Sequence, residues 1–320
     1  RDRLYMVRAD IRAAFDSLDH TRLLHLVRAL VPRHATYVLQ RHAQIRPGIG
    51  MIRRTQVRRA WLAPHPPSFL EQHAAQSAPP PRHAVLVDGV TYTTIKAEDV
   101  LARVEAHIQC TLVRIGNALH RQTTGIPQGS ILSTLLCNLV LADAERTYLS
   151  IDEDEDCLLR FTDDFLFVSP SYQRAYDVCQ ALHRGFPLHG CRIAPEKSLV
   201  NFDACLPTGH VVRRLAPHTP FPWCGICIDP TTLAIQPDTQ RYPRHMGDTL
   251  TVRAAGLTSM LVHAMHPRAA AVYTDTHLNT PYGVYTNLLE GFVFAAAKLR
   301  VFMRHMPFAL SLIHISEPTR

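Results

Sequence analysis

Short apolar runs alternate with amphipathic stretches along the chain, a pattern that predicts a mixture of strands and helices. The apolar run of residues 4–11 predicts a buried strand, and residues 17–31 predict a helix that Pro32 ends. Between residues 32 and 119 the periodicity weakens. A proline-rich stretch between Trp61 and Val85 predicts a loop or a partly disordered linker.

Regular patterning returns after residue 120. Gly125, Pro127 and Gly129 punctuate a loop, and Ser130 is expected to cap a long helix. The acidic run at 152–156 is expected to form a solvated hairpin turn.

The pattern of the C-terminal half predicts strands first and helices later. Ser169 and Pro170 are expected to begin a helix that Gly185 ends. Residues 191–202 and 221–229 are predicted to contain strands. Beyond Asp229 the segment turns helical and resembles a second, smaller domain.

The composition favours an anionic partner. The 320 residues carry 34 basic and 27 acidic side chains, a net charge of +7, and the isoelectric point is about 9.1. Such a balance suits nucleic acid but does not specify a fold. The clustered arginines Arg53, Arg54, Arg58 and Arg59 form either a solvated face or a phosphate-contacting patch.

Eight cysteines without a framework spacing predict free thiols and an intracellular protein. The lone pair Cys224 and Cys227 lacks the further ligands that a structural zinc site needs. No apolar run reaches the ~18 residues of a membrane span, so no membrane partner is expected. Because the chain begins as if within a domain, we expect it to be a fragment.

Three aspartates interrupt apolar runs: Asp10 follows the first predicted strand, and Asp163 and Asp164 lie between Phe161 and Phe165. If the two strands are neighbours, the carboxylates converge, and two such charges ~4 Å apart repel by about 4 kcal/mol at an effective dielectric near ~20. Either a shared proton or bound divalent cations would offset this repulsion. We expect Asp10 and Asp163 to bind most of the metal, with Asp164 assisting from the turn. Two unrelated surface aspartates are the alternative.

Five segments resemble, in order, motifs A, B′, C, D and E of the reverse transcriptases. Their residues are most similar to the form that these motifs take in the telomerase reverse transcriptases. They are VRADIRAAFDSLDH (7–20), TTGIPQGSILSTLLCN (123–138), LLRFTDDFLFVSP (158–170), PEKSLVNF (195–202) and FPWCGICID (221–229). The resemblance extends from Leu4 to Pro307. Thr162 departs from the family, which often has an aliphatic residue there.

The resemblance implies an α+β reverse transcriptase palm, an antiparallel sheet with packed helices, together with a helical insertion and a partial helical thumb. The implied parts are palm with motif A (1–31), a partly disordered insertion in the fingers domain (32–119), palm with motifs B′ to E (120–229) and a partial thumb or C-terminal extension (230–310). Residues 311–320 break the thumb pattern and are expected to be a non-native tail.

The resemblance also implies residue roles. The catalytic residues would be Asp10, Asp163 and Asp164, which would hold two Mg²⁺ ions together with the Ile11 carbonyl. The nucleotide-binding residues would be Phe15 as a steric gate, Gln128, Gly129 and Lys197, and the primer grip would be Trp223, Cys224 and Gly225. Outside the motifs, Phe15 would be interpreted as a core residue, Lys197 as a surface lysine and Trp223 as a packing residue.

The implied activity is RNA-templated addition of telomeric repeats to chromosome 3′ ends. The implied partners are telomerase RNA, a single-stranded telomeric DNA primer, dNTPs and telomerase accessory proteins, in the nucleus at telomeres. The family motifs that grip the triphosphate would lie upstream, so we expect the chain alone to be inactive. The alternatives are a retroelement-type reverse transcriptase and a non-catalytic nucleic-acid-binding module derived from a polymerase.

Overall fold

The computed structural model describes residues 4–48, 51–63, 68, 71, 85–239 and 270–305. The chain divides into two compact units, each assembled from separate stretches of sequence. Unit 1 comprises Arg1–Ile11, Tyr148–Gly185 and Arg192–Arg320, and unit 2 comprises Arg12–Thr147 and Phe186–Cys191.

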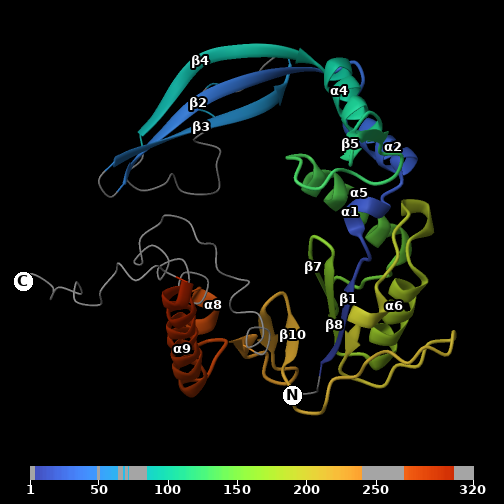
Figure 1. The fold of residues 1–320 in the computed structure, drawn as a ribbon, viewed down its shortest axis with the longest axis vertical. Coiled ribbons are helices and arrows are strands. Elements are labelled where there is room, and N and C mark those ends of the chain that lie inside the picture. Colours follow the sequence, from blue (N-terminus) through green and yellow to red (C-terminus); the bar gives the residue numbers. More distant parts are fainter. Residues whose placement is uncertain are drawn as a thin grey trace, which may run out of the picture. The chain divides into compact units, whose positions relative to one another are not determined.

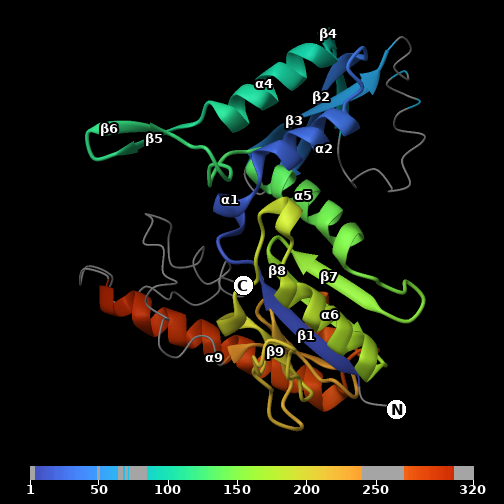
Figure 2. The same ribbon diagram turned by 90° about the vertical axis from the view of Figure 1, so that its right-hand side faces the viewer.

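An antiparallel sheet forms the centre of unit 1 (Figure 2). Its strand order is β7 (Cys157–Phe161), β8 (Asp164–Ser169), β1 (Tyr5–Asp10) and β9 (Leu199–Val200). Helix α6 (Tyr172–Arg184) packs against β1 and β8. Because side chains alternate along a strand, Met6, Arg8 and Asp10 share one face of β1, and Val7 and Ala9 share the other.

The face of β1 that carries Met6 forms a core with a second sheet. That sheet has the order β10 (Phe221–Trp223), β11 (Ile226–Ile228) and β12 (Ile235–Pro237). The buried side chains of this core are Met6, Leu166, Leu199, Phe221 and Ile228. This core joins β1 and β8 to the hairpin at 221–228, about 200 residues after β1 in sequence.

Two helices near the C-terminus complete the described part of unit 1, α8 (Ala271–Thr274) and α9 (Pro281–His305). Two buried asparagines connect them to β12. The Ile235 main-chain N–H donates to Asn279 (2.8 Å), and Asn287 donates to the Ile235 carbonyl (2.9 Å). The predicted helical character beyond Asp229 is confirmed for these residues, whereas 240–269 lie outside the described part.

Unit 2 contains a three-stranded antiparallel sheet, β3 (Met51–Leu62), β2 (Thr36–Gly48) and β4 (Val85–Lys96), followed by α4 (Ala97–Gln109) (Figure 1). A hairpin of β5 (Leu112–Ile115) and β6 (Ala118–Arg121) follows. The remaining helices are α1 (Ala14–Ser17), α2 (His20–Leu30), the 3-10 turn η1 (Pro187–His189) and α5 (Ser133–Tyr148), whose last residue belongs to unit 1. Another 3-10 turn, η2 (Pro195–Lys197), lies in unit 1.

A polar network holds the helices of unit 2 together. Asp143 of α5 accepts hydrogen bonds from Arg22 Nε of α2 (2.9 Å), and it pairs with the ring of the fully buried His189 (2.7 Å). Burial acts to raise the pKa of Asp143, but the hydrogen bonds from His189 and Arg22 outweigh it and lower the pKa. The carboxylate is therefore a structural one.

The expected helical insertion is wrong in its main element, because most of its described residues form the β3–β2–β4 sheet, with α4 as its helix. The physical reason is local: β4 contains Val85, Val87, Thr91, Tyr92 and Ile95, and β-branched and aromatic residues favour strands. The proline-rich linker lies almost entirely outside the described residues.

Two helix starts and one turn differ from expectation. Helix α5 begins at Ser133, although Ser130 Oγ does accept from the Leu132 N–H (3.3 Å). Ser171, and not Ser169, is the N-cap of α6, because its side chain accepts from the Arg174 N–H. The acidic run is a turn between α5 and β7 and not a hairpin, and its Asp156 is buried in an ion pair with Arg174.

Candidate functional site: an aspartate cluster at the end of the palm sheet

Strand register brings two of the predicted catalytic residues together. In the β1–β8 ladder Asp10 lies directly opposite Asp164, so both side chains project from the same sheet face. Opposed residues of this kind have Cβ atoms about 4.5–5.5 Å apart. The predicted convergence of the two strands is therefore present in the structure.

Asp163 lies in the turn between β7 and β8. Phe161 pairs with Asp164, which leaves Thr162 and Asp163 as the two turn residues, and Thr162 has the positive φ of 59°. The Ile11 main-chain N–H donates to the Asp163 carbonyl (3.3 Å) and connects the turn to the end of β1. The expectation that Asp164 occupies the turn is wrong, because Asp164 begins β8 and Asp163 is the turn residue.

The electrostatics of the cluster show crowding of negative charge. Burial raises the pKa of Asp163, and the neighbouring carboxylates of Asp10 and Asp164 raise it further, against a main-chain hydrogen bond that lowers it. Lys197 forms an ion pair with Asp10, whose side chain is only 9% exposed. The hydrogen bond and the charge of Asp10 raise the pKa of Lys197, so its ammonium stays protonated at neutral pH.

Arg8 belongs to this cluster, although the motif reasoning does not include it. One end of its guanidinium donates to the Pro222 carbonyl (3.0 Å), and the other end donates to the Lys197 carbonyl (3.3 Å). Burial lowers the pKa of Arg8, and the charge of Asp164 opposes that shift. The sequence could have indicated Arg8, because it precedes Asp10 by two residues on the same strand and so lies on the same face.

The β10–β11 hairpin holds the three predicted primer-grip residues. Cys224 and Gly225 form its two-residue turn with φ of 47° and 86°, a conformation that glycine adopts without strain. The exposed Cys224 thiol donates to Asp164 Oδ2 (3.7 Å), so the turn lies beside the aspartates. Trp223 packs against the buried core of unit 1.

The other predicted nucleotide-binding residues lie in unit 2. The Ile126 N–H donates to the Phe15 carbonyl (2.6 Å), and the Gly125 N–H donates to the Leu18 carbonyl (2.9 Å), which fastens the 125–129 loop to α1. Gln128 donates to Asp16 (3.3 Å), and Gly129 is exposed. The structure thus gathers the predicted residues into two groups, one in each unit.

The donor set of unit 1 suits a hard divalent cation. Asp10, Asp163 and Asp164 offer only carboxylate oxygens, and the charges of Asp10 and Asp164, which add to burial in raising the pKa of Asp163, are ones that a cation would neutralise. Within the described residues, no three His, Cys, Asp or Glu side chains are close enough to form a ready-made metal cage. A metal ion bound at this cluster would therefore take part of its ligand shell from outside these side chains.

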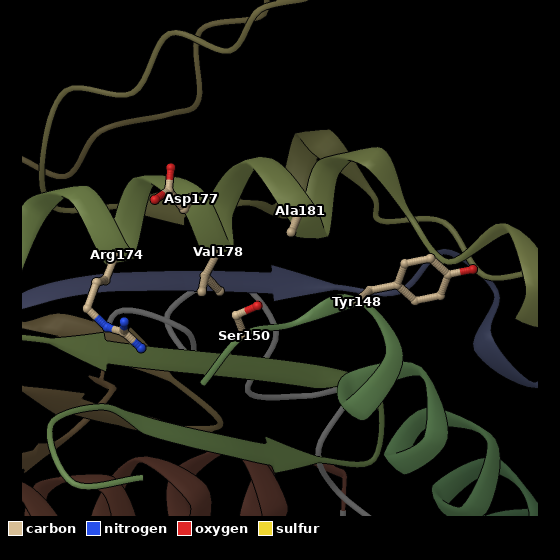
Figure 3. Close-up of a pocket in the computed structure, with 6 residues that line it drawn as sticks. All are labelled: Tyr148, Ser150, Arg174, Asp177, Val178 and Ala181. Carbon is tan, nitrogen blue, oxygen red and sulfur yellow. The ribbon is translucent and has the colours of Figure 1, made fainter. Parts of the chain in front are cut away.

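A hollow of about 150 Å³ beside α6 contains none of the predicted site residues (Figure 3). Its lining includes Arg174, whose guanidinium is paired with the buried Asp156. The hollow also borders Tyr148 and Ser150, just after α5. Its arginine is committed to holding the acidic turn on α6, and we assign the hollow no chemistry.

No helix in the described part combines the length and the apolar composition that crossing a bilayer requires.

Comparison with known proteins gives concordant matches. Residues 81–227 match the family model for reverse transcriptase (RNA-dependent DNA polymerase). Telomerase reverse transcriptase from Canis lupus familiaris is 30% identical over 320 residues, which cover 95% of this chain and 28% of the relative. Telomerase reverse transcriptase from Oryza sativa subsp. japonica is 31% identical over 260 residues, which cover 73% of this chain and 21% of the relative.

A solved structure supports the fold. Telomerase from Candida albicans, in complex with a TWJ fragment of telomeric RNA, superposes with a TM-score of 0.59 at 13% identity. The match covers 96% of this chain and 41% of that chain. The expected α+β palm is confirmed, apart from the sheet in the insertion. The chain spans about 28% of the length of its animal relatives, and it belongs to the telomerase reverse transcriptase family.

Proposed function

We propose that the chain forms the polymerase core of an RNA-directed DNA polymerase that adds telomeric repeats to chromosome 3′ ends by copying a telomerase RNA. The observation that carries this proposal is the register of β1 and β8, which sets Asp10 opposite Asp164 with Asp163 in the adjoining turn. Family membership supports the same conclusion. The proposed partners are telomerase RNA, a single-stranded telomeric primer, dNTPs and accessory proteins, in the nucleus at telomeres.

In the proposed reaction the primer 3′-OH attacks the α-phosphorus of a dNTP. A new P–O bond forms, the bond between the α-phosphorus and the bridging oxygen breaks, and pyrophosphate leaves. Asp10, Asp163, Asp164 and the Ile11 carbonyl would hold two Mg²⁺ ions, which when bound neutralise phosphate charge and activate the hydroxyl. The aspartates themselves position these groups, so catalysis depends on geometry and charge more than on covalent chemistry.

Lys197 is suited to a proton-donor role. Its side chain is 61% exposed, its ammonium reaches the aspartate cluster, and its raised pKa keeps it protonated at neutral pH. The ammonium can therefore pair with the negative charge that develops on the departing pyrophosphate and donate its proton there. Arg8 acts as a positioning residue, because it ties the Lys197 main chain to the hairpin at Pro222.

The remaining assignments are proposals on the family pattern. Phe15 would exclude the ribose 2′-OH, and Gln128 and Gly129 would contact the nucleotide and template. The fastening of the 125–129 loop to α1 supports a joint role for these residues. Trp223, Cys224 and Gly225 would seat the primer 3′ end, which the closeness of Cys224 to Asp164 supports.

The test uses the full-length protein reconstituted with telomerase RNA. Asp10→Ala and Asp163→Ala are each expected to reduce primer extension at least about 10²-fold, because each removes a carboxylate that would hold the Mg²⁺ ions at the transferring phosphoryl group. Binding of the RNA, measured by co-purification, is expected to be unchanged. Asp154→Ala, an exposed carboxylate in the acidic turn, is the matched control. Full extension by either of the first two variants would refute the assignment.

A further inference from the structure

The clustered arginines of the insertion lie on one open face of a β-ladder. In the pairing of β2 with β3, Arg41 lies directly opposite Arg58, so their side chains share a face. Arg54 follows on the same face, four residues from Arg58 along β3. All three side chains are exposed. We call this surface, made of Arg41, Arg54 and Arg58, the arginine face.

The opposite face of the same strands has a different character. Gln40 and His42, the neighbours of Arg41, are 0% and 4% exposed. Arg59, the neighbour of Arg58, is half-buried and pairs in register with Gln40. The sheet is therefore covered on one side and open on the other, and the arginine face is the open side.

The arginine face is electrostatically unfavourable by itself. Like charges directly opposite each other on a ladder destabilise it. Residues 36–62 contain six arginines and no aspartate or glutamate. Within the described part of the chain, none of the three arginines of the face forms an ion pair. The charge that would offset this repulsion must come from a bound anion or from the solvent.

The geometry favours a regular polyanion. Strand rise puts Arg54 and Arg58 about 13 Å apart along β3, which is the axial length of about four nucleotides in a B-form duplex. Exposed guanidinium groups make bidentate contacts with phosphate oxygens. Gln56 lies between the two arginines on the same face, is exposed and adds a neutral donor.

We propose that the arginine face binds the sugar–phosphate backbone of a nucleic acid, as a surface additional to the aspartate cluster of unit 1. The contact is to backbone phosphates and so independent of base sequence. It goes beyond the proposed polymerase function, because it concerns binding by the insertion and involves none of the catalytic residues.

The experiment measures binding of labelled single-stranded RNA, single-stranded DNA and a B-form DNA duplex to the chain by fluorescence anisotropy over a range of salt concentrations. The test variant is Arg54→Gln/Arg58→Gln, and Arg54→Lys/Arg58→Lys preserves the charge. Arg59→Gln is the matched control, because it alters the next residue on the opposite face. Thermal unfolding monitors the fold of every variant.

The glutamine double variant is expected to bind more weakly, and its slope of log K against log salt should fall by about 1.4 for single strands and about 1.8 for a duplex. The lysine double variant should keep the slope, and Arg59→Gln should keep both slope and affinity. The strongest of the three arms identifies the preferred nucleic acid.

Two results would overturn the proposal. One is a glutamine double variant with the affinity and salt slope of the unaltered chain. The other is that polyglutamate displaces the nucleic acid from the unaltered chain and binds the arginine face more tightly than nucleic acid does. That result would indicate an acidic protein partner. If Asp163→Ala binds nucleic acid normally but no longer extends a primer, binding by the arginine face is independent of the catalytic proposal. If Asp163→Ala retains extension, only the catalytic proposal fails.

Discussion

The ionised carboxylate of Asp163 destabilises the folded chain. Its pKa is raised by burial and by the charges of Asp10 and Asp164, so the folded chain holds the proton more tightly than the unfolded chain does. Ionisation at neutral pH therefore costs free energy of folding. Retention of an acidic residue at such a position fits a functional requirement for its charge.

Replacing Asp163 by asparagine is accordingly expected to stabilise the chain without metal. At pH 7 with a chelator, Asp163→Asn should raise Tm by about 2 °C or more, because the neutral amide removes the charge penalty. The gain should shrink as pH falls through the raised pKa of Asp163 and should vanish below about 3.9, where the carboxyl is protonated in both states. Differential scanning calorimetry measures both effects.

Asp154→Asn is the control for this measurement, since Asp154 is exposed in the acidic turn, and it should leave Tm unchanged. A lower Tm for Asp163→Asn at every pH would contradict the argument and assign Asp163 a structural role.

At the residue scale the sequence pointed to residues that interrupt a pattern, and strand register then set Asp10 opposite Asp164. Asp10, Asp163 and Asp164 stand out because charges within apolar runs are unusual. Arg8 was missed, because the hydrogen bonds that draw it into the cluster come from residues 197 and 222. Alternation along β1 places Arg8 on the face of Asp10, but the contacts with residues 197 and 222 leave no local signal in the sequence.

At the scale of elements, the loop at 125–129 depends on its close approach to α1. A Cβ added at Gly125 would lie 2.5 Å from main-chain atoms of Phe15 and Asp16, and the φ there is +75°. Gly129 also has a positive φ, +88°, but nothing lies within 4 Å of an added Cβ. An alanine at Gly129 would therefore meet only the conformational strain of a positive φ, whereas an alanine at Gly125 would also meet a steric clash.

Gly125→Ala and Gly129→Ala form a matched pair. Gly129→Ala should cost about 1 kcal/mol of unfolding free energy, from the left-handed conformation alone. Gly125→Ala should cost clearly more, because the backbone of α1 cannot move aside as a flexible side chain would. Urea unfolding of both variants gives the comparison. Equal losses would show that the packing of the loop on α1 contributes little.

The secondary structure of the insertion could not be predicted from the pattern of its sequence. Weak periodicity and the prolines suggested a loop or partial disorder, and the family resemblance suggested helix, yet residues 36–48, 51–62 and 85–96 pair as three strands. Each strand supplies β-branched or aromatic residues, and β2 and β3 follow each other closely along the chain, but β4 pairs with β2 residues that lie 40 to 60 positions earlier. Pairing partners at that distance are decided by the tertiary structure.

At the scale of the whole molecule, each of the two units is discontinuous in sequence. Strand β1 lies between β8 and β9 in the sheet, although it precedes them by over 150 residues. It buries Met6, Val7 and Ala9 almost completely. Burial of each large apolar side chain contributes roughly 1.5–3 kcal/mol, and domains are stable by only about 5–15 kcal/mol.

Residues 148–320 alone should therefore fail to fold cooperatively. Without β1, the edges of β8 and β9 are unpaired and their apolar faces are exposed. Joining residues 1–11 to this segment through a flexible linker should restore a cooperative thermal transition, measured by circular dichroism. An equally cooperative transition for 148–320 without β1 would contradict this account of the sheet.

The sequence by itself determined the family and the palm, and it singled out Asp10, Asp163 and Asp164 as the predicted metal ligands, because motif residues and apolar periodicity are local properties that can be recognised without coordinates. The domain boundaries assigned from the motifs and the roles of the individual site residues stay predictions. Only the tertiary structure decided the pairing of Asp10 with Asp164, the place of Arg8 beside them and the open arginine face. These depend on strand register and on contacts between distant segments, which the whole fold selects by burying one face of each strand.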